Sequence, residues 1–156
     1  MTIAAGFWTS QGILLCADSQ FTGSAKSNQP KIFGYPLHRS NRDHNCLIAF
    51  AVAGNAVNAK MAIEDCVEDI EECPPEKLTI KEAHSRFRAN VKKIHEQYVD
   101  TRSDPVEKEN ARFALVIGCW LPMKRGLRLF RTDGPGVTSE DYCCVGTGAY
   151  LGFVNK

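Results

Sequence analysis

The second residue of the chain, Thr2, has the chemistry of a nucleophile that brings its own base. Thr2 directly follows Met1, and removal of a methionine in front of a small residue such as threonine is usual. Removal leaves one residue with both a hydroxyl and a free α-amine. An α-amine titrates near ~7.7–8, so it can accept the hydroxyl proton at neutral pH. Such a pair is one known way to activate a threonine. The alternative is that Thr2 merely follows a start codon.

The charge balance argues against two classes of partner. The chain has a formal net charge of +1, with 24% charged and 44% hydrophobic residues. This balance produces no long-range field for nucleic acid or an anionic membrane. The N-terminus has no basic region followed by an apolar core, and no apolar run reaches spanning length. We therefore expect a cytoplasmic protein that binds neither nucleic acid nor a membrane.

The cysteines predict a reducing compartment rather than a metal site. Their spacing contains no Cys-x-x-Cys and no Cys/His pattern typical of zinc. Most of them lie in apolar segments, where a free thiol behaves as a small hydrophobic side chain. We expect no metal and no cofactor. The seven cysteines are Cys16, Cys46, Cys66, Cys73, Cys119, Cys143 and Cys144.

Hydrophobic patterns predict strands first and then two helices. Apolar residues at 3–7 and 13–17 flank a polar four-residue loop, which is typical of a β-hairpin. The run at 46–52 has the length and composition of a buried central strand. Apolar residues then recur at helical spacing over 55–72, and Pro74 ends that helix. A second helix should begin after Thr79, because Thr79 and Glu82 have capping-box spacing.

Further strands follow the helical pair. The segments 113–120 and 127–132 have the pattern of a second hairpin, and 143–145 is a short apolar strand. Strands grouped on both sides of two helices favour an α+β layered fold over alternating βαβ units. No repeat or linker divides the chain, so residues 1–156 are expected to form a single domain.

A set of motifs, in one order along the chain, resembles a known family. Thr2 is followed by the hairpin into Ala-Asp-Ser-Gln at 17–20, then by Lys-Ile-Phe at 31–33. Ala-Gly-Asn-Ala at 53–56 opens a helix, and Gly-Thr-Gly occupies 146–148. The order resembles that of the β-type subunits of the proteasome and, most closely, of the bacterial two-component proteasome-like protease, which are N-terminal nucleophile hydrolases. The resemblance extends over nearly the whole chain.

The resemblance implies a four-layer αββα sandwich, in which two antiparallel sheets pack face to face with helices outside. The sequence ends where this family begins another helix. The C-terminal part of the domain, with an aspartate that orders the nucleophile, is therefore expected to be truncated.

The resemblance also implies the site residues. Thr2 takes the position of the nucleophile, Asp18 that of the family's aspartate, and Lys31 that of the active-site lysine. Gly54 matches the glycine whose N–H helps to form the oxyanion hole, and Thr147 replaces the serine of a Gly-Ser-Gly turn beside the nucleophile. From residue type alone, other roles remain open. Asp18 could cap a turn, Lys31 could be a surface lysine, Gly54 could serve a tight corner, and Thr147 could lie in a plain turn.

The function implied by the resemblance is that of a threonine peptidase. The substrate would be a polypeptide, the assembly a homo-oligomeric ring, and the partner an ATPase ring that unfolds substrates. Two other interpretations remain open. The chain could be a catalytically silent structural subunit, or an N-terminal nucleophile amidase that acts on small amides.

Overall fold

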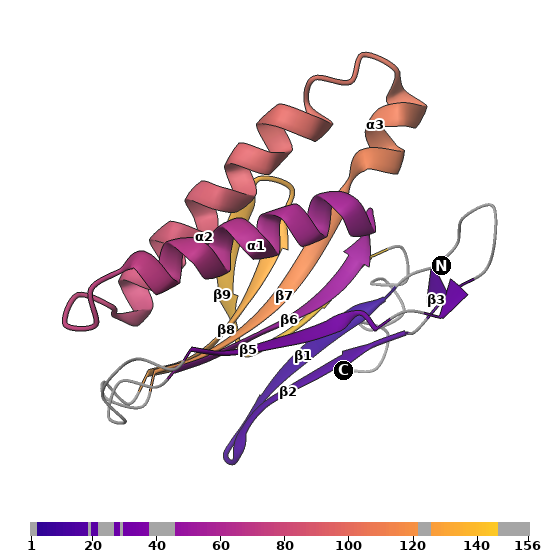
Figure 1. Cartoon of the computed structure of the whole chain (residues 1–156). Helices are drawn as coiled ribbons and strands as arrows, with labels where there is room; N and C mark the ends of the chain where they lie inside the picture. Colours follow the sequence, from indigo (N-terminus) through magenta and orange to yellow (C-terminus); the bar gives the residue numbers. More distant parts are fainter. Residues whose placement is uncertain are drawn as a thin grey trace.

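The computed structural model describes residues 3–18, 20–21, 27–28, 30–37, 46–121 and 126–146. The chain forms two packed antiparallel sheets with helices on one side (Figure 1). A separate two-stranded ladder joins β3 (Gln20–Phe21) to β4 (Ser27–Asn28). The other elements are β1 (Ala4–Thr9), β2 (Gly12–Ala17), β5 (Ile32–Leu37), β6 (Cys46–Gly54), α1 (Ala56–Glu72), α2 (Ile80–Ile94), the π-helix η2 (His95–Val99), α3 (Pro105–Ala111), β7 (Phe113–Leu121), β8 (Gly126–Asp133), β9 (Gly136–Glu140) and β10 (Tyr142–Val145).

The smaller sheet has the strand order β10-β1-β2 and contains both ends of the described chain. The predicted hairpin is confirmed, since β1 and β2 pair antiparallel from Ala4 opposite Ala17 to Thr9 opposite Gly12. The side chain of Thr9 accepts a hydrogen bond from the Gln11 amide across the turn. Strand β10 returns along the other side of β1, with Val145 opposite Ala4. The start of β1 is thus enclosed between two strands.

The larger sheet has the order β5-β6-β7-β8-β9, with β6 and β7 near its centre. These two strands carry the longest apolar runs of the chain and are mostly buried. The two sheets pack against each other through an apolar cluster that includes Ala4, Val116 and Leu129. An added Cβ on Gly6 of β1 would lie 2.6 Å from Val116 Cγ1 on β7, so the missing side chain allows this close approach.

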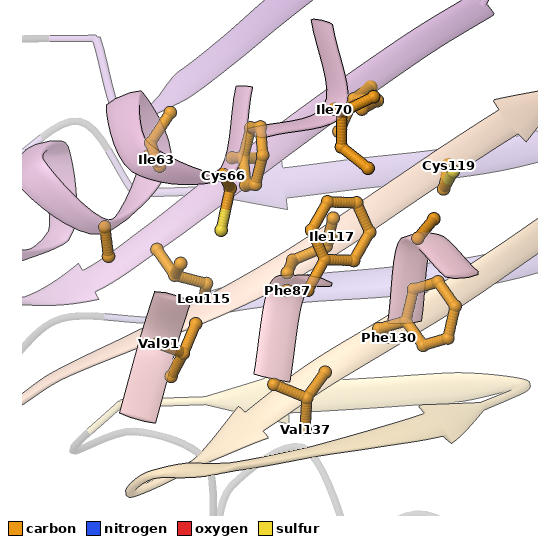
Figure 2. Close-up of a cluster of buried hydrophobic side chains, with 14 of the residues drawn as sticks. Ile63, Cys66, Ile70, Phe87, Val91, Leu115, Ile117, Cys119, Phe130 and Val137 are labelled. Carbon is orange, nitrogen blue, oxygen red and sulfur yellow. The ribbon is translucent and has the colours of Figure 1, made fainter. Parts of the chain in front are cut away.

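Helices α1 and α2 cover the opposite face of the larger sheet (Figure 1). Their buried stripes meet the sheet in the cluster of Figure 2, where Phe87 from α2 lies among side chains of the strands. The Phe87 ring makes edge-to-face contacts with Phe50 of β6 and Phe130 of β8. Both helices begin at capped ends, with Asn55 before α1 and Thr79 before α2.

The α+β class and the two stacked antiparallel sheets agree with the expectation from the sequence. Within the described ranges the fold supplies three of the four expected layers, because both long helices lie on the larger sheet. The strands β3, β4, β5 and β9 and the helix α3 were not predicted. No helix in the described part of the chain is long and apolar enough to cross a membrane.

Candidate active site

Asp18 and Lys31 form an ion pair at the start of β1. The Lys31 Nζ atom lies 2.9 Å from Asp18 Oδ1, although the two residues come from different sheets. Asp18 directly follows β2 and Lys31 directly precedes β5. The same Asp18 oxygen accepts a hydrogen bond from the Ile3 amide at 3.1 Å, and the Asp18 amide donates to the Ile3 carbonyl at 3.1 Å. The β1–β2 pairing therefore fixes the carboxylate beside the first described residue.

The ion pair is largely removed from solvent. The Lys31 side chain is 1% exposed and the Asp18 side chain 26% exposed. Burial of a charge is unfavourable unless a partner compensates it, and here each group has one. Burial of the Asp18 carboxyl acts to raise its pKa. The hydrogen bonds from Lys31 and Ile3 and the lysine charge outweigh that effect, so the pKa of Asp18 is lowered from 3.8.

Gly54 ends β6 at the corner that leads into α1. It has a φ of +86°, a conformation that L side chains rarely adopt. Within a strand, N–H groups two residues apart point to the same side. The Val52 N–H donates to the Lys31 carbonyl at 2.9 Å, so the Gly54 N–H is directed to the side of β6 on which Lys31 lies. Gly54 thus offers a donor on the side of β6 where the Lys31 backbone pairs.

Two of the five predicted site residues, Thr2 and Thr147, lie outside the described residues. Their described neighbours are close in space, since Ala4 of β1 pairs with Val145 of β10. Each of these two residues is two positions along the chain from one of the threonines. The structure therefore brings Asp18 and Lys31 together and places Gly54 on their side of β6.

An open cavity of about 810 Å³ borders this end of the two sheets. Gly54 and Gly146 both contribute to its wall, together with His95, Arg112 and Arg131. His95 is 3% exposed, and its Nε2 atom makes no hydrogen bond with any group that the structure describes. Its ring stacks on Phe113, which lies opposite Gly54 in the β6–β7 ladder. Asp18 and Lys31 do not line this cavity, which Gly54 borders.

The sequence did not reveal the groups that hold Asp18 and the corner at Gly54 in place. The Ile3 amide contributes through its backbone, which no side-chain motif reveals. Asn55 and Asn58 hold the corner at Gly54 through bonds to residues more than fifty positions away. The one available signal was the position of Asn55 at the start of the helix predicted over 55–72, where asparagine is a favoured cap.

No cluster of three or more potential metal ligands occurs among the described side chains. The arrangement instead offers a buried cation, a paired carboxylate and a backbone donor around the start of a strand. The cation and the backbone donor can stabilise negative charge that develops on an attacked carbonyl, and the carboxylate keeps the cation in place.

Comparisons with protein-family models and with curated proteins give no match. Solved structures do match. Anbu, described as an ancestral β-subunit, from Yersinia bercovieri has a TM-score of 0.68 at 16% identity, with 96% of this chain and 62% of that chain covered. The helical assembly of the Anbu complex from Pseudomonas aeruginosa gives a TM-score of 0.68 at 12% identity, with 96% and 62% covered. HslV from Trypanosoma brucei gives 0.53 at 16% identity, with 96% and 74% covered.

The chain therefore spans less than two thirds of the length of these Anbu chains. At such identities the likeness concerns the fold. The chain shares the fold of the solved Anbu and HslV structures, as the resemblance in the sequence implied.

Proposed function

We propose that this chain is a threonine-type peptidase subunit in which Thr2 is the nucleophile after removal of Met1. The observation that carries the proposal is the 2.9 Å pair between Lys31 Nζ and Asp18 Oδ1, with the Ile3 amide on the same oxygen. The Ile3 nitrogen is covalently bonded to residue 2. The counter-ion of a buried cation thus accepts a hydrogen bond from the residue that directly follows Thr2 in the chain.

In the proposed reaction, the Thr2 hydroxyl oxygen attacks the carbonyl carbon of a peptide bond, and the α-amine takes the hydroxyl proton. The Lys31 ammonium favours both the neutral amine and the developing negative charge, because like charges repel and opposite charges attract. Asp18 keeps Lys31 charged and oriented. The carbonyl oxygen, now negative, accepts a hydrogen bond from the Gly54 N–H.

The C–N bond of the substrate then breaks, and the departing amine receives the proton that the α-amine had taken from the Thr2 hydroxyl. Thr2 is left as an ester with the acyl part of the substrate. A water molecule attacks this ester, the α-amine again accepts and returns a proton, and the free hydroxyl is restored. Thr147 is proposed to stand beside the nucleophile in the Gly-Thr-Gly turn.

The proposed substrate is a polypeptide, cleaved inside a ring of copies of this chain that receives unfolded segments from an ATPase ring. The solved helical assembly of Anbu supports self-association of this fold. The proposed compartment is the cytoplasm. Among the described residues none of the seven cysteines is paired in a disulfide, which suits a reducing environment.

The test is an intact-mass measurement after incubation with an epoxyketone or β-lactone probe. The peptidase proposal predicts loss of Met1 and addition of one probe, and it predicts that Thr2→Ala abolishes both labelling and peptide hydrolysis. Thr138→Ala is the matched control, because Thr138 is an exposed threonine on β9. Peptide hydrolysis that is unchanged in Thr2→Ala would refute the proposal.

The other outcomes identify the alternatives. Retention of Met1 without labelling would indicate a silent structural subunit. Labelling combined with hydrolysis of small amides, but not of peptides, would indicate an amidase. Sedimentation velocity tests the ring separately, and a stable monomer would count against it.

A further inference from the structure

Three consecutive backbone carbonyls near Gly54 are each held by a hydrogen bond from one of two asparagines. Asn55 Nδ2 donates to the Asn110 carbonyl at 3.0 Å, and Asn58 Nδ2 donates to the Ala111 carbonyl at 2.8 Å. The Asn55 amide donates to the Arg112 carbonyl at 2.8 Å. We call Asn55 and Asn58, with these three carbonyls, the asparagine clamp.

The asparagine clamp joins two parts of the chain that are far apart in sequence. It connects the corner between β6 and α1 to the segment between α3 and β7, and these two junctions lie at the same end of the larger sheet (Figure 1). Asn58 is 8% exposed, so its bond to Ala111 is shielded from water. Asn55 also caps α1, because its Oδ1 accepts from the Asn58 amide at 3.0 Å.

The backbone of Arg112 and Phe113 lies very close to Gly54. A Cβ at Gly54 would lie 2.5 Å from the Arg112 carbonyl oxygen and 3.0 Å from Phe113 Cα. Gly54 directly precedes Asn55, so the bond between the Asn55 amide and Arg112 fixes the peptide that follows Gly54. The Gly54 N–H belongs to the peptide before Gly54, so the asparagine clamp acts on it through the Gly54 Cα, against which Arg112 and Phe113 lie. A shift of residues 110–112 would move this Cα and the N–H attached to the same residue.

We propose that Asn55 and Asn58 are positioning residues for the Gly54 N–H, which they hold in the direction that an oxyanion requires. This inference rests on the proposed function of Gly54 as an oxyanion donor. An oxyanion donor stabilises the transition state because its N–H is already oriented before the reaction. A small displacement of the N–H therefore lowers the rate strongly. Neither asparagine needs to touch the substrate. Their loss should therefore lower kcat and leave KM nearly unchanged.

The experiment compares kcat and KM for peptide hydrolysis in Asn58→Ala and Asn55→Asp. The second variant keeps the oxygen that caps α1, and it replaces the donor to Asn110 with a carboxylate oxygen, which cannot bond to that carbonyl. We expect kcat to fall about 10- to 100-fold in each, with KM within about twofold. Asn90→Ala is the matched control, because Asn90 Nδ2 donates to Asp69 Oδ2 at 2.9 Å on the helical layer, and it should keep the parental kcat.

A second measurement does not depend on activity. In protein labelled with ¹⁵N-glycine, the Gly54 amide resonance should shift in both clamp variants and stay in place in Asn90→Ala. If Asn58→Ala fails to fold, Asn55→Asp provides both measurements with the cap retained.

The outcomes separate the two proposals. A folded Asn55→Asp with the parental kcat would show that the asparagine clamp does not position the Gly54 N–H. An unshifted Gly54 resonance would show the same. If the parental protein hydrolyses no peptide and takes up no probe, the proposed function fails. The shift of the Gly54 resonance would then still decide whether the clamp positions this amide.

Discussion

Asp18 and Lys31 are joined by a 2.9 Å ion pair, and the Asp18 oxygen of that pair also accepts the Ile3 amide. The lysine side chain is almost completely buried, whereas the aspartate retains partial contact with solvent. The pair therefore connects the end of β2, the beginning of β5 and the residue before β1. Its charges cannot be altered without consequences for both the local fold and the proposed chemistry.

Replacement of Lys31 by methionine tests the role of the cation. Methionine fills the space of the aliphatic stem but leaves no charge beside the proposed nucleophile. We expect probe labelling and peptide hydrolysis to slow by about 100-fold or more, since proton transfer by the α-amine would lose its electrostatic support. Lys60→Met is the control, because Lys60 is 69% exposed on α1. Equal rates for parental protein and Lys31→Met would remove Lys31 from the mechanism.

The pH dependence of stability tests the environment of Asp18. Its pKa in the folded state is lowered from 3.8, so the unfolded chain binds a proton more readily than the folded one. The stability that this pair contributes is present above 3.8 and is lost as the pH falls through the lower, folded pKa. The free energy of unfolding, measured with urea, should fall more steeply below pH 3.8 in the parental protein than in Asp18→Asn. If the free energy of unfolding falls equally with pH in the two proteins over this acidic range, the pKa of Asp18 is not lowered by folding.

Strong local patterns made much of the fold predictable. The apolar stripes of α1 and α2 and the long buried runs of β6 and β7 each repeat over many residues, so their type follows from the sequence alone. Two of the elements that were missed, α3 and β9, bury very little. Helix α3 buries only Ala111, and β9 buries only Val137 at the edge of the sheet. With one buried side chain each, neither segment has a periodicity that sequence reasoning can detect.

The site was predictable from the resemblance rather than from the residues. Asp18 and Lys31 are thirteen positions apart in ordinary polar surroundings, and only the pairing of strands brings their side chains together. Their chemical types allowed a role and did not establish one. The bonds of Asn55 and Asn58 to the backbone before β7 depend on tertiary packing, which no local pattern encodes.

Substitution of His95 by phenylalanine tests a second pH effect. Burial disfavours the charged ring, and Arg112 adds to this effect. Together they outweigh Asp100 and the Phe113 backbone, so the pKa of His95 is lowered from 6.5. Below 6.5 the unfolded chain therefore takes up a proton that the folded chain resists, and stability falls with decreasing pH. His95→Phe retains a ring against Phe113, and its free energy of unfolding, measured with urea, should depend less on pH below 6.5.

His84→Phe is the control for this measurement. His84 also stacks on a phenylalanine, Phe130, but is only partly buried on α2. The control should keep the slope of the parental protein just below pH 6.5, because His95 is still present. A slope that survives in His95→Phe would assign the effect to another group.

A pair of glycine substitutions separates strain at the proposed oxyanion donor from a general effect of added side chains. Gly54→Ala would place a Cβ 2.5 Å from the Arg112 oxygen at a φ of +86°. The left-handed conformation alone should cost about 1–2 kcal/mol, and the overlap adds to it. Gly34→Ala on β5 meets no atom within 4 Å and should change the free energy of unfolding by less than ~0.5 kcal/mol. Urea unfolding of both variants measures the difference. Equal losses would mean that the corner relaxes around a side chain, and then Gly54 would not be held as tightly as an oxyanion donor requires.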